Sequence, residues 1–364
     1  MDIIMFGHKR IPSREGGVEV VTEQLAVRMA EKGHRVTCLN RGGDSARKKE
    51  YCGVRLCSMP TIPVKGLSAV SSSLFAAFYC VCHKADVVHI HGEGPAFWCW
   101  LPKLFGKKVV VTIHGLDWAR EKWSGSFASR YIRWGEQATV RFADEIIVLS
   151  RNMQDYFLKT YGRNTSFLPN GTERVQPAEA KEITEAFGLK KDSYLLFLGR
   201  LVPEKGLRCL LKAFRKMETE KKLLIAGGAS DSSAYVRELK RLAKGDGRVI
   251  FTGFVQGQKL RELYSNAYLY ILPSDLEGMP IGLLEAMNYG NCCVVSDIPE
   301  CAEVVEDKAV LFRQGDGEDL RRQLQKLCYD EQLVRFYRQQ SREQVASKHN
   351  WDCITEQTLE LYQR

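Results

Sequence analysis

Short apolar segments alternate with longer helical stretches along this chain, and this alternation constrains its fold more than any other feature. The first half contains five expected strands and two expected helices: strands at 3–6, 35–39, 87–90, 108–113 and 145–149, and helices at 18–31 and 67–82. Parallel strands need long crossover connections, usually helices, which then cover both faces of the sheet. The pattern predicts an α/β first domain, Rossmann-like, over residues 1–168.

The same alternation restarts after a break at Leu168-Pro169-Asn170-Gly171, which a polar stretch extends to Pro177. Turn-forming residues at this density indicate an interdomain linker. The second half then contains strands at 194–198, 222–226, 248–251, 267–272, 291–295 and 309–312, and helices at 178–187, 206–216, 233–244, 258–265 and 281–289. A chain of 364 residues fits two domains, so residues 172–347 are predicted to form a second Rossmann-like domain.

Two glutamates stand eight positions apart directly after the expected strand at 267–272. Glu277 precedes a helix that Pro280 is suited to open, and Glu285 lies on that helix. Open α/β sheets bind ligands beyond the carboxyl ends of their strands, and amides at a helix N-terminus attract anions. The segment therefore suits a ligand with phosphates and hydroxyls. The alternative is a solvated helix whose acids only favour its dipole.

Two cations flank a proline turn after the first strand of the second half. Arg200 and Lys205 lie five residues apart in the run Gly199 to Gly206. Such a pair is suited to neutralise the charge that develops on a departing diphosphate, and no metal is then required. The Asp-x-Asp metal motif is absent from the sequence. The alternative is two solvated side chains in a surface loop.

In the first half, a glycine pair and a histidine follow expected strands. Gly16 and Gly17 open the helix at 18–31, where a backbone without side chains can approach a diphosphate closely. His114 follows the strand at 108–113, where an imidazole can donate to a sugar hydroxyl or relay the proton of an acceptor. A helix cap and a structural histidine are the alternatives. His91 is a further candidate at such a strand end, whereas His89 is expected to pack.

Together these motifs resemble glycosyltransferase family 4, whose retaining members have an E-x7-E signature and a G-R-L-x-x-x-K-G segment. The resemblance implies the GT-B fold, two Rossmann-like domains with parallel sheets facing across a cleft, with the helix at about 348–364 crossing back onto the first domain. It implies a nucleoside-diphosphate sugar as donor substrate, no cofactor and no metal. The catalytic residues would be His114, Glu277, Arg200 and Lys205. The donor would contact Gly16, Gly17, Arg200, Lys205, Glu277, Gly278, Met279, Pro280, Ile281 and Glu285.

The resemblance also assigns roles within the site. Glu277 would meet the transferred sugar, Glu285 the ribose, and Arg200 with Lys205 the diphosphate. Residues 114–123, with the opening segment 6–12, look like rhamnosyltransferase-type members that build bacterial capsule or cell-wall polysaccharide. A nucleotide-sugar 2-epimerase of the same fold and a non-catalytic nucleotide-sugar-binding protein are the rival functions. A dehydrogenase is disfavoured because no G-x-G-x-x-G follows the first strand.

The net positive charge of the chain comes from its first half. Residues 1–170 contain 24 of the 53 Lys and Arg residues but only 15 of the 44 Asp and Glu residues. This excess, with the aromatic and basic segment 118–134, suits a glycan or lipid-linked acceptor and an anionic membrane surface. Ordinary solubilising charge and an amphipathic helix that packs its aromatics inward are the alternatives. No nucleic-acid-binding motif accompanies the charge.

The cysteines and the first residues of the chain indicate its cellular compartment. The twelve cysteines form no C-x-x-C pair, which favours reduced thiols and no zinc site. The first residues form an expected strand instead of a signal peptide, and the apolar segment 67–82 contains serines and is too short to span a membrane. We expect a cytoplasmic protein, and peripheral attachment to the inner face of the plasma membrane stays open.

Overall fold

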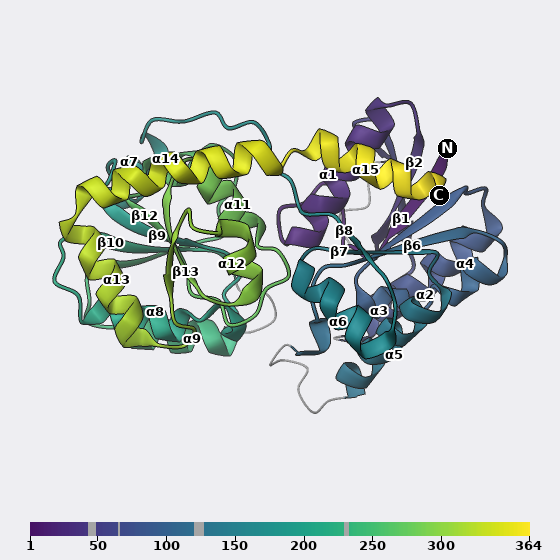
Figure 1. The fold of residues 1–364 in the computed structure, drawn as a ribbon, viewed down its shortest axis with the longest axis horizontal. Helices are drawn as coiled ribbons and strands as arrows, with labels where there is room; N and C mark the ends of the chain where they lie inside the picture. The colour runs from purple at the N-terminus through teal and green to yellow at the C-terminus, as the bar shows by residue number, and fades with distance from the viewer. Residues whose placement is uncertain (43–48, 65, 120–126, 229–232) are drawn as a thin grey trace. The chain divides into compact units, whose positions relative to one another are not determined.

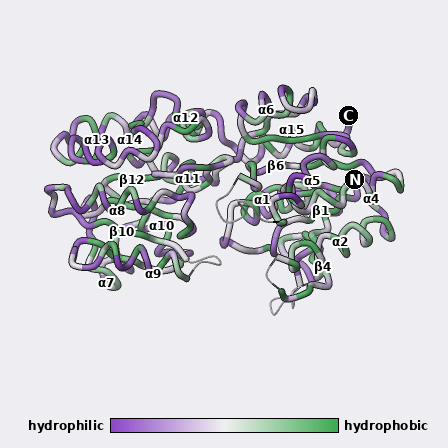
Figure 2. The backbone as a smooth tube through the Cα atoms, turned by 90° about the horizontal axis from the view of Figure 1, so that it is seen from below, coloured by the Kyte–Doolittle hydropathy of each residue, from purple (hydrophilic) through white to green (hydrophobic). Residues whose placement is uncertain are grey.

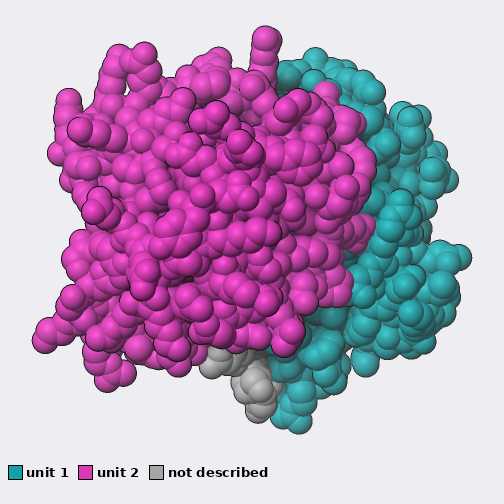
Figure 3. All heavy atoms as spheres, turned by 60° about the vertical axis from the view of Figure 1, so that its left-hand side comes forward, with its two compact units in different colours: residues 1–170, 351–364 teal, residues 171–350 magenta. Residues whose placement is uncertain are grey.

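The chain folds into two compact units in a computed structural model that describes residues 1–364 except 43–48, 65, 120–126 and 229–232. Unit 1 contains Met1–Asn170 together with Trp351–Arg364, and unit 2 contains Gly171–Asn350. Figure 3 colours the two units separately. Each unit has its own parallel sheet and its own helices (Figure 1).

Unit 1 is built on an eight-stranded sheet in the order β3-β4-β2-β1-β5-β6-β7-β8. The strands are β1 Asp2–Phe6, β2 Arg35–Arg41, β3 Glu50–Tyr51, β4 Val54–Met59, β5 Val87–His91, β6 Lys108–Ile113, β7 Glu145–Val148 and β8 Ser166–Phe167. All neighbours pair in parallel except β3, which pairs antiparallel with β4. The helices are α1 Gly17–Glu31, α2 Leu67–Cys82, α3 Glu93–Ala96, α4 Trp100–Leu104, α5 Phe127–Phe142, α6 Arg151–Tyr161 and α15 Trp351–Gln363, with a 3-10 turn η1 at Asp117–Ala119.

Unit 2 is built on a six-stranded, all-parallel sheet in the order β11-β10-β9-β12-β13-β14. The strands are β9 Tyr194–Leu198, β10 Lys222–Ala226, β11 Val249–Gly253, β12 Leu269–Leu272, β13 Cys292–Ser296 and β14 Val310–Phe312. The helices are α7 Glu182–Phe187, α8 Leu207–Arg215, α9 Ser233–Leu242, α10 Gly257–Asn266, α11 Ile281–Asn288, α12 Pro299–Val305, α13 Gly317–Tyr329 and α14 Glu331–Lys348, with a 3-10 turn η3 at Pro203–Lys205.

The central strands of both sheets are buried along nearly their whole length because helices cover both faces. All five residues of β1, β5 and β13 are buried. The hydropathy colouring of Figure 2 follows the backbone of both units. Sequences such as Val-Val-His-Ile-His in β5 and Leu-Tyr-Ile-Leu in β12 are typical of strands buried on both sides. Burial therefore replaces the alternating pattern of half-exposed strands.

Strand order places the candidate sites. When strands are numbered by their order in each unit, leaving out the short β3, the sheet of unit 1 reads 3-2-1-4-5-6-7 and that of unit 2 reads 3-2-1-4-5-6. In this arrangement the connections from strands 1 and 4 leave in opposite directions, and a crevice opens at their carboxyl ends. This strand order places the expected crevice of unit 1 between β1 and β5, and that of unit 2 between β9 and β12.

Several expected elements have the same bounds in the structure, and others differ. Residues 67–82, 108–113, 194–198 and 222–226 match α2, β6, β9 and β10. The helix expected at 178–187 begins only at Glu182, and the strand at β4 was not expected. The sequence does not predict β4 because Arg55 and Ser58 interrupt its apolar pattern. β4 lies next to the short edge strand β3.

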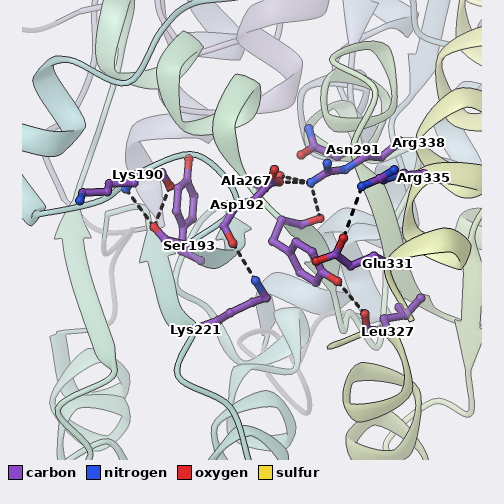
Figure 4. Close-up of polar contacts among 12 residues, drawn as sticks. Lys190, Asp192, Ser193, Lys221, Ala267, Asn291, Leu327, Glu331, Arg335 and Arg338 are labelled. Carbon is purple, nitrogen blue, oxygen red and sulfur yellow. Dashed lines mark hydrogen bonds and ion pairs between the residues drawn. The ribbon is translucent and has the colours of Figure 1, made fainter. Parts of the chain in front are cut away.

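At the amino-terminal ends of the central strands of unit 2, a polar cluster ties α14 to the sheet (Figure 4). Arg338 Nη2 of α14 donates to the backbone oxygens of Ala267 and Tyr268, at 3.0 Å each, and pairs with Asp192. Lys221 Nζ donates to the Asp192 oxygen at 2.8 Å and lies 3.8 Å from the Tyr268 ring centroid. These contacts lie before β9 and β12, away from the carboxyl ends at which open α/β sheets bind ligands.

Candidate functional site

The loops after β9 and β12 meet closely at the crevice of unit 2. The Asp275 amide donates to the Glu204 oxygen at 2.8 Å. Gly206 has a φ of +65°, and a Cβ at this residue would lie 1.8 Å from the Pro273 oxygen. No side chain fits at this contact, so Gly206 lets the two loops pack backbone against backbone. The loop that carries Arg200 and Lys205 is thereby set against the loop that carries Glu277.

Lys205 and Glu277 form a direct ion pair at this place. Lys205 Nζ lies 2.5 Å from Glu277 Oε1, and the two side chains are only 14% and 10% exposed. Ser274 Oγ donates to the same carboxylate oxygen at 2.6 Å, and Ser296 Oγ donates to the Ser274 backbone oxygen at 2.5 Å. Two strands, β12 and β13, thus fix the carboxylate, and the structure brings together the cation and the acid.

The segment after Glu277 leads into α11. Gly278 and Ile281 are half-buried, while Met279 and Pro280 are buried. The sequence predicts that Pro280 opens the helix from within its first turn, but in the structure Pro280 is the N-cap of α11. Its backbone oxygen accepts hydrogen bonds from the amides of Leu283 and Leu284. The first amides of the helix therefore point toward the crevice end of the sheet, which suits an anion.

Glu285 lies one turn into α11 and is held by a tyrosine that sequence reasoning did not identify. Tyr264 of α10 donates from its hydroxyl to Glu285 Oε2 at 3.0 Å, and burial with the nearby Glu285 charge raises the pKa of Tyr264 well above its usual value. Arg200 is half-buried on the loop after β9. Tyr264 lies in an ordinary amphipathic helix, so its sequence carries no signal of this role.

In unit 1, Gly16 and Gly17 lie where the sequence placed them, but an acid lies beside them. Gly16 is the N-cap of α1 and Gly17 its first residue. Glu19 is buried, and its Oε1 accepts the Lys9 amide at 3.0 Å while its Oε2 lies 2.4 Å from where a Gly16 Cβ would be. Glu19 therefore ties the loop after β1 to the start of α1, a role that sequence reasoning missed.

Four histidines gather at the carboxyl ends of β1, β5 and β6. His8 is buried, and its Nε2 lies 3.0 Å from Asn40 Oδ1. His91 Nδ1 lies 3.1 Å from His114 Nε2. His89 contacts Tyr362 of α15 and Thr112 at 2.6 and 2.7 Å. Burial lowers the pKa of His8 to about 4 and that of His89 to about 3, so both rings are neutral at pH 7.

The segment after His114 is supported by two buried glutamates that sequence reasoning also missed. Glu93, directly after β5, accepts the Asp117 amide at 2.8 Å. Glu136 of α5 accepts Trp118 Nε1 at 3.0 Å and the Tyr156 hydroxyl at 2.9 Å. Burial, followed by a hydrogen bond with Glu136, raises the pKa of Glu93 well above its usual value. An acid directly after a buried strand was the available signal for Glu93.

Parts of the predicted aromatic and basic segment lie outside the described residues, namely Arg120, Glu121, Lys122 and Trp123. In the part of the chain that the structure describes, no three His, Cys, Asp or Glu side chains are grouped to hold a metal ion. The described helices include none that is long and apolar enough to cross a membrane.

Comparison with known protein families gives two matches that together span most of the chain. Residues 15–174 match the family described as "Glycosyltransferase Family 4", and residues 179–344 match the family described as "Glycosyl transferases group 1". The first covers most of unit 1, and the second contains all the predicted site residues of unit 2.

Similar proteins and structures point the same way. The chain is 26% identical to alpha-maltose-1-phosphate synthase of Mycolicibacterium smegmatis, covering 100% of this chain and 99% of that protein. It is 25% identical to N-acetyl-alpha-D-glucosaminyl L-malate synthase of Bacillus anthracis, covering 95% and 93%. Sucrose-phosphate synthase of Thermosynechococcus elongatus has a TM-score of 0.82 at 20% identity, covering 99% and 98%. HepE of Anabaena, solved with UDP-glucose, has a TM-score of 0.83 at 18% identity, covering 98% of each chain.

Proposed function

Because this chain belongs to glycosyltransferase family 4 and has the GT-B fold, we propose that it is a retaining enzyme that transfers a sugar from a nucleoside diphosphate to a glycan or lipid-linked acceptor. The observation that carries the proposal is the Lys205–Glu277 pair at the crevice of unit 2. A cation for the diphosphate and an acid for sugar hydroxyls lie side by side there, next to the start of α11.

The donor can bind without breaking this pair. An ammonium group has three N–H donors, so Lys205 can hold Glu277 and still donate to phosphate oxygens. Arg200, on the same loop, would add a second cation, and the first amides of α11 would bind further phosphate oxygens. Glu277 would then accept a hydroxyl of the sugar and Glu285 a hydroxyl of the ribose. The UDP-glucose bound to HepE of Anabaena supports a donor of this class.

The positive charges also carry the chemical step in this proposal. When the glycosyl bond breaks, negative charge develops on the departing diphosphate, and preorganised cations stabilise it in the transition state. Lys205 and Arg200 would do this in place of a metal ion, so we propose metal-independent transfer. Gly16, Gly17 and His114 of unit 1 are proposed to contact the same donor. These roles stay predictions.

A membrane surface is proposed for the acceptor side, on the exposed face of α5. This face carries Phe127, Arg130, Arg133, Trp134 and Arg141, and Phe127 and Trp134 are 64% and 44% exposed. The acid of this helix, Glu136, is buried. Aromatic and arginine side chains without exposed acids suit anionic headgroups. We propose peripheral attachment there and a lipid-linked precursor of a cell-surface polysaccharide, capsule included, as acceptor.

A donor panel tests the proposed function. The full chain would be incubated with nucleoside diphosphates carrying hexoses and deoxyhexoses, rhamnose included, and melting temperatures would be recorded, since a ligand that binds only the folded state raises them. Products would then be read by mass with and without acceptor, with EDTA in a parallel series. Transfer that persists in EDTA is expected. An altered nucleotide sugar formed without acceptor would identify a 2-epimerase, and binding without any turnover would identify a non-catalytic protein.

Vesicles test the membrane proposal separately. We expect the protein to co-sediment with vesicles containing anionic phosphatidylglycerol and to be released by salt, because the Debye length falls with ionic strength. Neutral phosphatidylcholine vesicles are the control. Equal binding to both, or binding unaffected by the double variant Phe127→Ser and Trp134→Ser, would contradict the assignment of α5.

A further inference from the structure

His91 and His114 form a hydrogen-bonded pair at the carboxyl ends of two neighbouring strands. β5 ends at His91, which lies in register with Thr112 of β6, and His114 follows β6 directly. His91 Nδ1 and His114 Nε2 are 3.1 Å apart, with ring centroids at 5.3 Å. His91 is 1% exposed, whereas His114 is half-buried. The His91 ring is therefore enclosed, and the His114 ring is partly exposed at the surface of unit 1.

A hydrogen bond between two imidazole nitrogens needs one proton and one lone pair, so the proton count decides which ring donates. Burial lowers the pKa of His91 well below its usual value, and the neighbouring His89, His114 and His8 lower it further. His91 is therefore neutral and carries a single N–H. Its other nitrogen, Nε2, is buried without a hydrogen-bond partner among the described residues.

The position of that single proton follows from the cost of the unpaired nitrogen. If the proton were on Nε2, an N–H donor would be buried without an acceptor, the rarer and costlier of the two arrangements. If the proton is on Nδ1, it is shared with His114, and only a lone pair is left unpaired. A charged His114 leads to the unfavourable arrangement as well. A proton on His114 Nε2 would make His91 Nδ1 the acceptor, and the His91 proton would then lie on the buried Nε2.

The structure assigns His91 as a positioning residue, and we propose that it holds His114 as the tautomer protonated at Nδ1. His114 Nε2 then accepts from His91, and the proton of the neutral His114 ring lies on Nδ1, whose N–H is a hydrogen-bond donor. In the proposed transfer, His114 would donate to an oxygen of the substrate and would not serve as general base for the acceptor. The role in transfer rests on the proposed function, whereas the tautomer rests on the burial and the hydrogen bonding of His91.

Nuclear magnetic resonance reads the tautomer directly. Full-length protein with isotope-labelled histidine would be studied by long-range proton–nitrogen correlation at pH 7, and signals of the seven histidines would be assigned with single variants. We expect neutral rings protonated at Nδ1 for both His91 and His114. His114 protonated at Nε2, or a charged His114, would overturn the inference.

Two substitutions of His91 separate positioning from folding. Asn places an amide donor where Nδ1 lies, so His91→Asn is expected to keep most of the turnover that His91→Leu loses, and the loss in His91→Leu is expected to be about tenfold in kcat. Tyr362→Phe is the matched control: it removes a 2.6 Å hydrogen bond to the adjacent buried His89 and should lower the melting temperature without changing the His114 tautomer.

The outcomes keep this inference apart from the proposed function. The tautomer is measured in ligand-free protein, so a lack of turnover with every donor would overturn the proposed function and leave the tautomer assignment standing. Turnover together with equal activity of His91→Asn and His91→Leu would overturn the positioning role.

Discussion

At the scale of single residues, the chemistry of unit 2 depends on two side chains that the sequence assigned to different parts of one donor. The structure shows them in contact, with Lys205 Nζ 2.5 Å from Glu277 Oε1. Sequence spacing alone does not contain this contact, since 72 residues separate the pair. The carboxylate is also fixed by Ser274, which a reading of charged residues passes over.

We predict that Lys205→Ala lowers kcat/KM by about 100-fold or more, because the transition state loses a preorganised cation. Glu277→Gln keeps the volume but removes the carboxylate, and it should reduce turnover to a similar extent. Steady-state kinetics with the donor found by the panel measures both. Lys216→Ala, at a lysine that is 70% exposed, is the control and should match the wild type. Loss of activity in the control variant alone would contradict the assignment.

At the scale of elements, the site depends on backbone packing that brings loops together. Gly206 joins η3 to α8, and its φ of +65°, with the Pro273 oxygen 1.8 Å from the place of an added Cβ, leaves no space for a side chain. A glycine in the motif was evident from the sequence, but its contact with the β12 loop was not, because that contact exists only once β9 and β12 pair.

We predict that Gly206→Ala destabilises unit 2 by about 4 kcal/mol, because the new Cβ forces the two loops apart. Gly245→Ala is a matched control: its φ is +90° but nothing lies within 4 Å of the added Cβ, so only backbone strain of about 1 kcal/mol is expected. Urea denaturation followed by circular dichroism measures both. Equal losses in the two variants would show that the close contact carries no energy.

The polar cluster that ties α14 to the sheet allows two arginines of one helix, Arg338 and Arg335, to be compared. Arg338→Ala leaves the Ala267 and Tyr268 oxygens without this donor, and we predict a loss of about 2 kcal/mol in the free energy of unfolding. Arg335, one turn earlier, is 77% exposed and pairs with Glu331 at 3.4 Å, so Arg335→Ala should stay within about 0.5 kcal/mol of wild type. Chemical denaturation compares the two, and a larger loss for Arg335→Ala would contradict this account.

At the scale of the whole molecule, the two units differ in their response to acid. The pKa of histidine in the unfolded state is 6.5. In the folded state, burial lowers the pKa of His8 to about 4 and the pKa of His89 to about 3, and it also lowers the pKa of His91. The unfolded chain therefore binds more protons than the folded chain below pH 6.5. Stability from these residues is fully present above pH 6.5 and is lost as the pH falls toward 4.

All six tryptophans belong to the two segments of unit 1, so their fluorescence reports on that unit. Circular dichroism reports on both units. We predict that lowering the pH from 7 to 5 lowers the urea midpoint seen by tryptophan fluorescence more than it lowers the urea concentration at which the circular dichroism transition ends. Protonating His8 or His89 costs about 2 kcal/mol each at pH 5. Glu93 acts in the opposite direction, because its raised pKa favours the folded state at low pH, but it is one group against three histidines. Coincident shifts by both probes would contradict the prediction.

The α/β class, the two rounds of strand–helix alternation and the glycosyltransferase family could all be predicted from the residues in order, and all are confirmed here, because periodic burial and short motifs are local properties of the chain. Which side chains meet is evident only in the folded chain. The Lys205–Glu277 pair, the Tyr264–Glu285 bond and the His91–His114 bond each join residues from different elements. Such contacts depend on strand order and on the burial that follows from it, and neither can be read from neighbouring residues in the chain.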